Sequence, residues 1–179
     1  PNGQGIIALM ALNILKEFQF TEKLHVETVH RQLEAMKMAF KDGLFYITDP
    51  KAMKVKTEQL LDPKLGPVRA AQITDCAQDP QVSKLPQSGT VYLCTADEEG
   101  NMVSYIQSNY MGFGSGIVVD GTGIALQNRG RGFSLDEKHA NYLEPRKRTY
   151  HTIIPGFMMK DGKAIGPFGI MGGHMQPQG

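Results

Sequence analysis

The chain has 179 residues, enough for one ordinary domain with a hydrophobic core. Its 19 Lys and Arg nearly balance its 18 Asp and Glu, so no broad charged surface favours nucleic acid or an anionic membrane. No apolar run approaches the roughly eighteen residues that a membrane-spanning helix needs. We therefore expect a soluble protein that acts on a small molecule or a peptide.

The first residues, PNGQGIIALM, contain neither an initiator Met nor a basic region before an apolar run. We expect them to come from within a longer protein and not from a signal peptide, which leaves the compartment open. Cys76 and Cys94 do not form the clustered pattern of small disulfide-rich domains. Both are expected to be free thiols.

Two amphipathic helices are predicted in the first half of the chain. Residues 4–18 form the first, because apolar side chains recur there at steps of three and four. Residues 26–40 form the second, with Glu34 on its solvent-facing side and Gly43 as its C-terminal cap. The apolar stripe of this second helix is expected to consist of Val26, Val29, Leu33, Met36 and Phe40.

A third helical stretch is expected over residues 57–73, interrupted at Pro63 and at Gly66-Pro67. After it the composition changes. Residues 74–88 are rich in Asp, Gln, Ser and Pro, which is typical of an exposed loop that builds no core. We place a boundary between the helical part and the following part in this loop.

The second half of the chain has β-prone runs. VYLCTA and MVSYIQ flank the turn-forming residues 97–101 and are predicted to form a hairpin. Further strands are expected at residues 116–119, 123–126, 152–160 and 163–168, with a tight turn at Asp161-Gly162. Helices followed by consecutive hairpins favour an α+β fold, in which helices cover antiparallel sheet, over a doubly wound parallel sheet.

Several chemical motifs are absent or incomplete. The five histidines are scattered, and the closest pair, His25 and His30, points away from a common ligand position on a helix. We therefore expect no metal, and no pattern indicates another cofactor. The run GFGSG at residues 112–116 lacks the Lys-Ser/Thr of phosphate loops and is predicted to be a tight turn. Arg146-Lys147-Arg148 lacks interleaved aromatic residues, which favours a solvated surface or one substrate-anion contact over nucleic acid.

The most informative element is Ser88-Gly89-Thr90, where the loop meets a strand. A Gly-Thr dipeptide alone indicates only the start of a strand. The surrounding stretch GTVYLCTADEEGNMVSYIQSNYMGFGSG, however, resembles the start of the small subunit of gamma-glutamyltranspeptidases. In that family a nucleophilic Thr opens a strand, an acidic turn ends in Gly-Asn, and a hydroxyl residue near the end of the next strand precedes a Phe-Gly-Ser/Thr-Gly turn.

The resemblance extends over nearly the whole chain. The further matches, in the family's order, are HRQLEAMKMAFKDGLFYITDP, TGIALQNRGRGFS, KRTYHTIIPGFMMKDGK and the pair Gly172-Gly173. The resemblance implies the four-layer αββα sandwich of N-terminal-nucleophile hydrolases, present here as a fragment. It also implies that residues 1–89 end a large subunit and residues 90–179 begin a small one, both made from one precursor.

The same resemblance implies a mechanism. Thr90 becomes the nucleophile once the bond from Gly89 is cut, and its own α-amine then serves as the base. A free α-amine, with a pKa of about 7.7–8.0, is partly unprotonated near neutral pH. The family places a hydroxyl at Ser108 close to the nucleophile and the N–H groups of Gly172 and Gly173 at the developing oxyanion. The implied activity is hydrolysis or transfer of a gamma-glutamyl or glutaryl-like acyl group from an amide.

Departures from the family pattern concern the substrate. Thr152 matches the second of two serines that contact the substrate carboxylate, and His151 replaces the first. Arg131 and Gly132 replace an Asp-Asp pair, of which the second member holds the substrate's α-ammonium group. Arg129 and Arg131 reverse the local charge and are expected to favour an acyl chain that ends in a carboxylate, as in the cephalosporin-acylase-like branch. The alternative is a surface turn in which both arginines point into solvent.

Two further departures bear on the reaction. Tyr110 stands where an Asn is expected, which argues against transfer to an amino-acid acceptor, and Val91-Tyr92 replaces Thr-His after the nucleophile. Two rival classes remain at this point. An inactive family member would bind ligand without cleavage before Thr90, and an unrelated structural αββα module would lack both cleavage and a pocket at the glycine pair.

Overall fold

The computed structural model describes residues 2–78 and 90–179, so Gly89 lies outside the described residues. The chain divides into two compact units. The first unit comprises Pro1–Ser83 and Phe133–Tyr150, and the second comprises Lys84–Gly132 and His151–Gly179. Each unit is therefore built from two separate segments of the chain.

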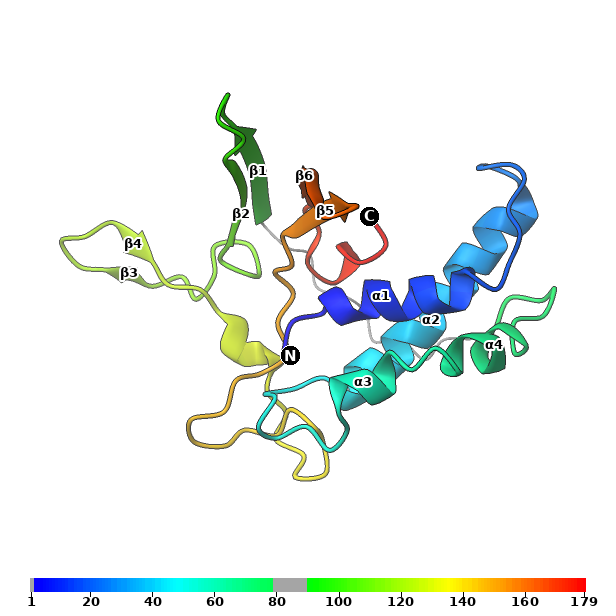
Figure 1. Cartoon of the computed structure of the whole chain (residues 1–179). Helices are drawn as coiled ribbons and strands as arrows, with labels where there is room; N and C mark the ends of the chain where they lie inside the picture. The colour runs from blue at the N-terminus through cyan, green and yellow to red at the C-terminus, as the bar shows by residue number, and fades with distance from the viewer. Residues whose placement is uncertain (1, 79–89) are drawn as a thin grey trace. The chain divides into compact units, whose positions relative to one another are not determined.

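Helices dominate the first unit. In Figure 1, α1 (Gly5–Leu15) lies against α2 (Val26–Tyr46), and α4 (Leu65–Ala70) packs on α1. A short helix, α3 (Thr57–Leu60), precedes α4. The buried core consists of Ile6, Ile7, Met10, Ala11, Ala39, Phe40, Ile47, Leu60 and Tyr150. The predicted helices at residues 4–18 and 26–40 are confirmed, with shifted ends.

Gly43 is not a helix cap, so that prediction is wrong. α2 continues past Gly43 to Tyr46. A Cβ atom at Gly43 would lie 2.5 Å from Cδ1 of Ile7, a side chain that is completely buried in α1. Glycine is required there because α1 and α2 approach each other closely, and not because the helix ends.

The buried face of α2 also differs from the predicted stripe. Val26 and Leu33 are 78% and 56% exposed, whereas Glu34 is only 2% exposed. The Glu34 carboxylate accepts a hydrogen bond from Lys37 Nζ at 2.5 Å, so the buried charge is paired. The N-terminal apolar stripe of α2 therefore faces solvent in this chain.

The stretch predicted over residues 57–73 forms two short helices, α3 and α4. The interruption at Pro63 is confirmed, because the chain turns around Asp62, whose carboxylate accepts the Lys64 N–H at 2.9 Å. The interruption predicted at Gly66-Pro67 is wrong. Both residues lie in the first turn of α4, where the missing N–H of proline breaks no helical hydrogen bond.

Antiparallel hairpins make up the second unit. Among its described residues β1 (Thr90–Ala96) pairs with β2 (Met102–Ser108) and β3 (Val118–Val119) pairs with β4 (Ile124–Ala125). β5 (Gly156–Lys160) pairs with β6 (Lys163–Phe168), and two short 3-10 turns lie at Arg129–Gly132 and Gly173–Met175 (Figure 1). The predicted hairpins and their turns are confirmed, although β3 and β4 are shorter than expected.

The first and third hairpins are joined by side chains. Ser104 Oγ on β2 donates to the Gly156 carbonyl at 2.9 Å and is hydrogen-bonded to Tyr92 on β1. Strand β5 begins only at Gly156, so the strand predicted from residue 152 starts too early. Pro155 has no N–H for a ladder, and the Thr152 side chain is engaged elsewhere in the unit.

Two other expectations concern the surface of the chain. Cys76 and Cys94 are exposed free thiols, as predicted. Within residues 2–78 and 90–179, no helix combines the length and the apolar character that crossing a membrane requires.

Candidate active site

Thr90 and Ser108 face each other at the open end of the first hairpin. They are directly opposed in the ladder, which places both side chains on one face of it. Thr90 Oγ1 donates a hydrogen bond to Ser108 Oγ at 3.1 Å. Ser108 Oγ also accepts the backbone N–H of Tyr110 at 2.9 Å. The hydroxyl of Ser108 therefore joins Thr90 to the turn that follows β2.

Tyr110 opens that turn in an uncommon conformation. Its φ is +78°, and its side chain belongs to the buried set of the second unit. The turn is bound to the next chain segment, because Met111 N donates to Asn128 Oδ1 at 3.1 Å. At Gly114, with φ +71°, a Cβ would lie 2.4 Å from the Leu126 carbonyl oxygen. This contact explains the glycine and confirms the predicted tight turn.

Arg129 lies beside Tyr110 and is fixed from two directions. Its guanidinium carbon is 5.2 Å from the centre of the Tyr110 ring. Nη1 donates to Oγ1 of Thr152 at 2.9 Å, and Thr152 is only 2% exposed. Burial lowers the pKa of Arg129, yet a guanidinium stays charged in proteins. Nη2 is buried, and no atom of the described residues accepts a hydrogen bond from it.

Arg131 behaves differently from Arg129. It is exposed, and no ion pair or side-chain hydrogen bond links it to another described residue. Burial raises the pKa of Tyr110, while the charges of Arg129 and Arg131 oppose that shift. The two arginines are therefore not equivalent: the guanidinium of Arg129 is enclosed, and the side chain of Arg131 faces solvent.

His151 is half-buried and precedes Thr152. Its Nδ1 accepts the Ile153 N–H at 3.1 Å. Burial is the larger cause that lowers the pKa of His151, and the positive charge of Arg129 lowers it further. The imidazole is therefore neutral near pH 7.

The glycine pair lies in a turn that also supplies a histidine to the site. Gly172 and Gly173 both have positive φ, +137° and +57°, in which a side chain would be strained. The ring of His174, the next residue, lies 6.4 Å from the Tyr110 ring, centre to centre. Burial lowers the pKa of His174. The sequence reasoning missed His174, whose only signal was its position directly after the glycine pair.

The structure thus brings half of the predicted site residues into one network within the second unit. Tyr110 contacts Ser108 through its backbone, and Arg129 and His174 through its ring. Thr90 joins the network through Ser108, and Thr152 joins it through Arg129. In the part of the chain that the structure describes, no group of three or more His, Cys, Asp or Glu is placed to hold a metal ion.

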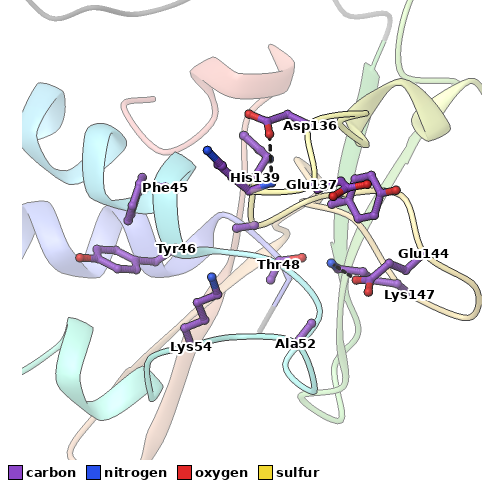
Figure 2. Close-up of a pocket in the computed structure, with 13 residues that line it drawn as sticks. Phe45, Tyr46, Thr48, Ala52, Lys54, Asp136, Glu137, His139, Glu144 and Lys147 are labelled. Atoms are coloured by element: carbon purple, nitrogen blue, oxygen red, sulfur yellow. Dashed lines mark hydrogen bonds and ion pairs between the residues drawn. The ribbon is translucent and has the colours of Figure 1, made fainter.

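A pocket of about 590 Å³ lies in the first unit and contains none of these residues. Figure 2 shows Phe45, Tyr46 and Thr48, from the end of α2 and the loop after it, among its lining side chains. Glu144 and Lys147 come from the second segment of that unit, and Lys147 Nζ lies 2.5 Å from Glu144 Oε2. The matched segment at residues 30–50 and the basic cluster Arg146-Lys147-Arg148 contribute side chains to this pocket, but no predicted catalytic or substrate-binding residue lines it.

Comparison with known proteins identifies relatives of the whole chain. The gamma-glutamyltranspeptidase family matches residues 1–179. The glutathione hydrolase-like YwrD proenzyme of Bacillus subtilis (strain 168) is 44% identical, over 99% of this chain and 34% of the relative. The oxamate amidohydrolase proenzyme of Klebsiella pneumoniae is 39% identical, over 99% of this chain and 34% of the relative. A crystal structure of cephalosporin acylase from Bacillus halodurans has a TM-score of 0.91 at 59% identity, over 99% of this chain and 32% of that one.

These likenesses confirm the predicted α+β class and the αββα fold of N-terminal-nucleophile hydrolases, of which this chain supplies a part. The chain belongs to the gamma-glutamyltranspeptidase family. It spans about a third of the length of the curated relatives that it matches. Membership of the family rules out the unrelated structural module.

Proposed function

We propose that the whole protein is a self-processing amidohydrolase of the gamma-glutamyltranspeptidase type, with Thr90 as its nucleophile. The observation that carries this proposal is the position of Thr90 at the first residue of β1, with its hydroxyl 3.1 Å from Ser108 Oγ. A threonine hydroxyl needs an adjacent base, and the α-amine that cleavage exposes is such a base. The word proenzyme in the names of two relatives supports a precursor that is cut into large and small subunits.

Maturation uses the hydroxyl of Thr90 itself. Oγ1 attacks the Gly89 carbonyl carbon, the Gly89–Thr90 C–N bond breaks, and the hydroxyl proton passes to the departing amine. Water then hydrolyses the ester, which leaves a carboxylate on Gly89 and a free amine and hydroxyl on Thr90. Glycine before the cut keeps the carbonyl accessible to attack.

Substrate turnover repeats this chemistry on an external amide. Thr90 Oγ1 forms an ester with the acyl group, the amine leaves with a proton, and water releases the acid and regenerates the hydroxyl. Ser108 accepts a hydrogen bond from Oγ1 and so orients the attacking oxygen. The N–H groups of Gly172 and Gly173 stabilise the oxyanion, a role worth about 2.7–4 kcal/mol per donor in other hydrolases. We expect hydrolysis and not transfer to an amino acid, because Tyr110 stands where the family pattern has an Asn.

Substitution of Thr90 tests the proposal on the full-length protein. Thr90→Ala should hydrolyse neither gamma-glutamyl nor glutaryl p-nitroanilide, whereas Thr90→Ser should retain part of the activity because it keeps the hydroxyl. Thr95→Ala, at an exposed threonine on the same strand, is the matched control. Mass spectrometry of acid-quenched reactions should find the acyl group on the peptide that begins at Thr90. Full activity of Thr90→Ala would overturn the proposal, and a wild type that binds ligand without hydrolysis would support an inactive binding protein.

A further inference from the structure

Arg129 has the geometry of a receptor for a planar anion. The bond to Thr152 and the ring of Tyr110 hold its guanidinium from two directions. Both partners are nearly inaccessible to solvent, at 2% and 8% exposure, so they cannot easily move aside. A guanidinium that is already fixed loses little freedom when it binds a carboxylate.

Within the residues that the structure describes, the same guanidinium lacks a counter-charge. Nη2 is buried without an acceptor, and no Asp or Glu of residues 2–78 and 90–179 forms an ion pair with Arg129. Proteins rarely leave a buried charged donor unpaired, because desolvation without a partner is costly. An anion that arrives with the substrate would supply the missing acceptor.

Among the described residues, the titratable groups around Arg129 add no negative charge. Burial favours the neutral form of the two titratable groups that interact with Arg129, since it raises the pKa of Tyr110 and lowers that of His151. It also lowers the pKa of His174, whose ring contacts Tyr110. In the described part of the chain, the other charge that acts on Tyr110 is that of the cationic Arg131. This part of the site therefore favours an anion and repels an ammonium group.

We propose that Arg129 binds a free carboxylate of the acyl donor, so that the preferred substrates are amides of dicarboxylic acids such as oxalyl, succinyl or glutaryl amides. Thr152 and Tyr110 act as positioning residues for the guanidinium. A gamma-glutamyl amide differs from a glutaryl amide by an α-ammonium group, for which the turn at Arg129–Gly132 offers no carboxylate. This inference rests on the proposed function and names the substrate class of the same site.

The test compares three p-nitroanilides on the whole processed protein: glutaryl, its uncharged methyl ester, and gamma-glutamyl. A charge-assisted hydrogen bond predicts that kcat/KM for the glutaryl anilide exceeds that for its methyl ester by about ten- to a hundredfold. The gamma-glutamyl anilide keeps the carboxylate but adds an ammonium group beside a cationic guanidinium, so it should also be a poorer substrate than the glutaryl anilide. Arg129→Gln should abolish the preference for the glutaryl anilide over its methyl ester while self-cleavage and hydrolysis of that ester continue. Arg131→Gln should have a much smaller effect, because its charge is exposed. Lys160→Gln, at an exposed lysine of β5, controls for the loss of one positive charge.

The outcomes separate this inference from the proposed function. A wild type that cleaves itself but favours the gamma-glutamyl anilide by about tenfold or more overturns the inference alone. An equal loss on all three substrates in Arg129→Gln also overturns it, because that pattern marks a structural ion pair within the whole protein. A wild type that neither cleaves itself nor hydrolyses any anilide overturns both.

A measurement on the unmodified enzyme covers the case in which Arg129→Gln does not fold. Glutarate should inhibit hydrolysis competitively, and pentanamide, which carries no carboxylate, should inhibit about ten- to a hundredfold more weakly. Equal inhibition by the two compounds would overturn the inference. Thr152→Val, which frees Nη1 but keeps the charge, should weaken inhibition by glutarate more than inhibition by pentanamide.

Discussion

Ser108 is the residue on which the arrangement of the nucleophile depends. Its hydroxyl accepts from both Thr90 Oγ1 and Tyr110 N, so it orients the attacking oxygen and also fixes the backbone of Tyr110 at positive φ. Because the Tyr110 ring then contacts Arg129, one side chain couples the reacting atom to the proposed carboxylate receptor.

Removal of this hydroxyl should slow catalysis without abolishing it. Ser108→Ala removes the acceptor that orients Thr90 Oγ1, a hydrogen bond worth about 0.5–1.5 kcal/mol, which corresponds to about a two- to tenfold decrease in kcat/KM. Ser108→Thr should recover most of the activity because it restores the hydroxyl. Gln107→Ala, at an exposed neighbour on β2, is the control. Ser108→Ala with wild-type kinetics and wild-type self-cleavage would contradict this role.

His151 and His174 should make stability depend on pH. Burial lowers the pKa of both in the folded protein, so below the ordinary value of about 6.5 the unfolded chain takes up protons that the folded chain does not. Stability is therefore retained above about pH 6.5 and lost as the pH falls through the folded-state pKa values. The Tm of the processed protein should drop between about pH 7 and about pH 5, and less so in a His151→Gln, His174→Gln double variant. A drop of the same size in the double variant would exclude these histidines as its source.

The elements that position the site are turns, and the turn after β2 is the most constrained. Gly114 and Gly116 both have positive φ, +71° and +74°. They differ in surroundings, because a Cβ at Gly114 would meet the Leu126 carbonyl oxygen at 2.4 Å, while one at Gly116 would have no atom within 4 Å. The close approach holds the turn against the segment that leads to Arg129.

This difference gives a matched pair of variants. Gly116→Ala should cost only the backbone strain of positive φ, about 1–2 kcal/mol. Gly114→Ala should lower the free energy of unfolding by that amount and by about 1–3 kcal/mol more. The added Cβ would meet the Leu126 carbonyl oxygen, a backbone atom that cannot move aside as a side chain can. Denaturant unfolding of the whole protein measures both. Equal losses for the two variants would show that the turn does not need this close approach.

Pattern and propensity predicted the elements of this chain better than their contacts. The periodicity of α2 was visible, but the sequence could not show that Gly43 meets Ile7 or that the face with Glu34 is buried, since both depend on a distant helix. Turn chemistry predicted the hairpins, because Asp97 and Gly100 determine their turn locally.

The candidate site shows the same limit. Ordered family motifs indicated Thr90 and Ser108, which the structure then placed in contact. Which of Arg129 and Arg131 points inward depends on the contacts of a 3-10 turn, and the sequence left that choice open. His174 belongs to no motif, and only its ring contact with Tyr110 in the structure identifies it as part of the site.

At the scale of the whole molecule, large apolar side chains face solvent in both units. Val26 and Leu33 on α2, and Val91, Val103 and Tyr105 on the first hairpin, are exposed. Apolar surface of this kind normally packs against protein. The relatives are about three times as long as this chain, and a larger protein is expected to cover these faces.

The isolated 179-residue chain should therefore unfold at a lower temperature than the whole protein, bind a hydrophobic dye, and hydrolyse amides poorly. Calorimetry, dye fluorescence and anilide hydrolysis on both proteins would check this. Equal turnover by the isolated chain and the whole protein would show that the exposed faces need no partner for activity.

The central claim is that Thr90 becomes an N-terminal nucleophile, and the intact mass of freshly made full-length protein, followed over time, tests it most directly. The wild type should change from one chain into two, and N-terminal sequencing of the smaller product should read Thr-Val-Tyr. Thr90→Ala should remain a single chain under the same conditions. A wild type that stays uncut, or a product that begins at any other residue, would contradict the claim.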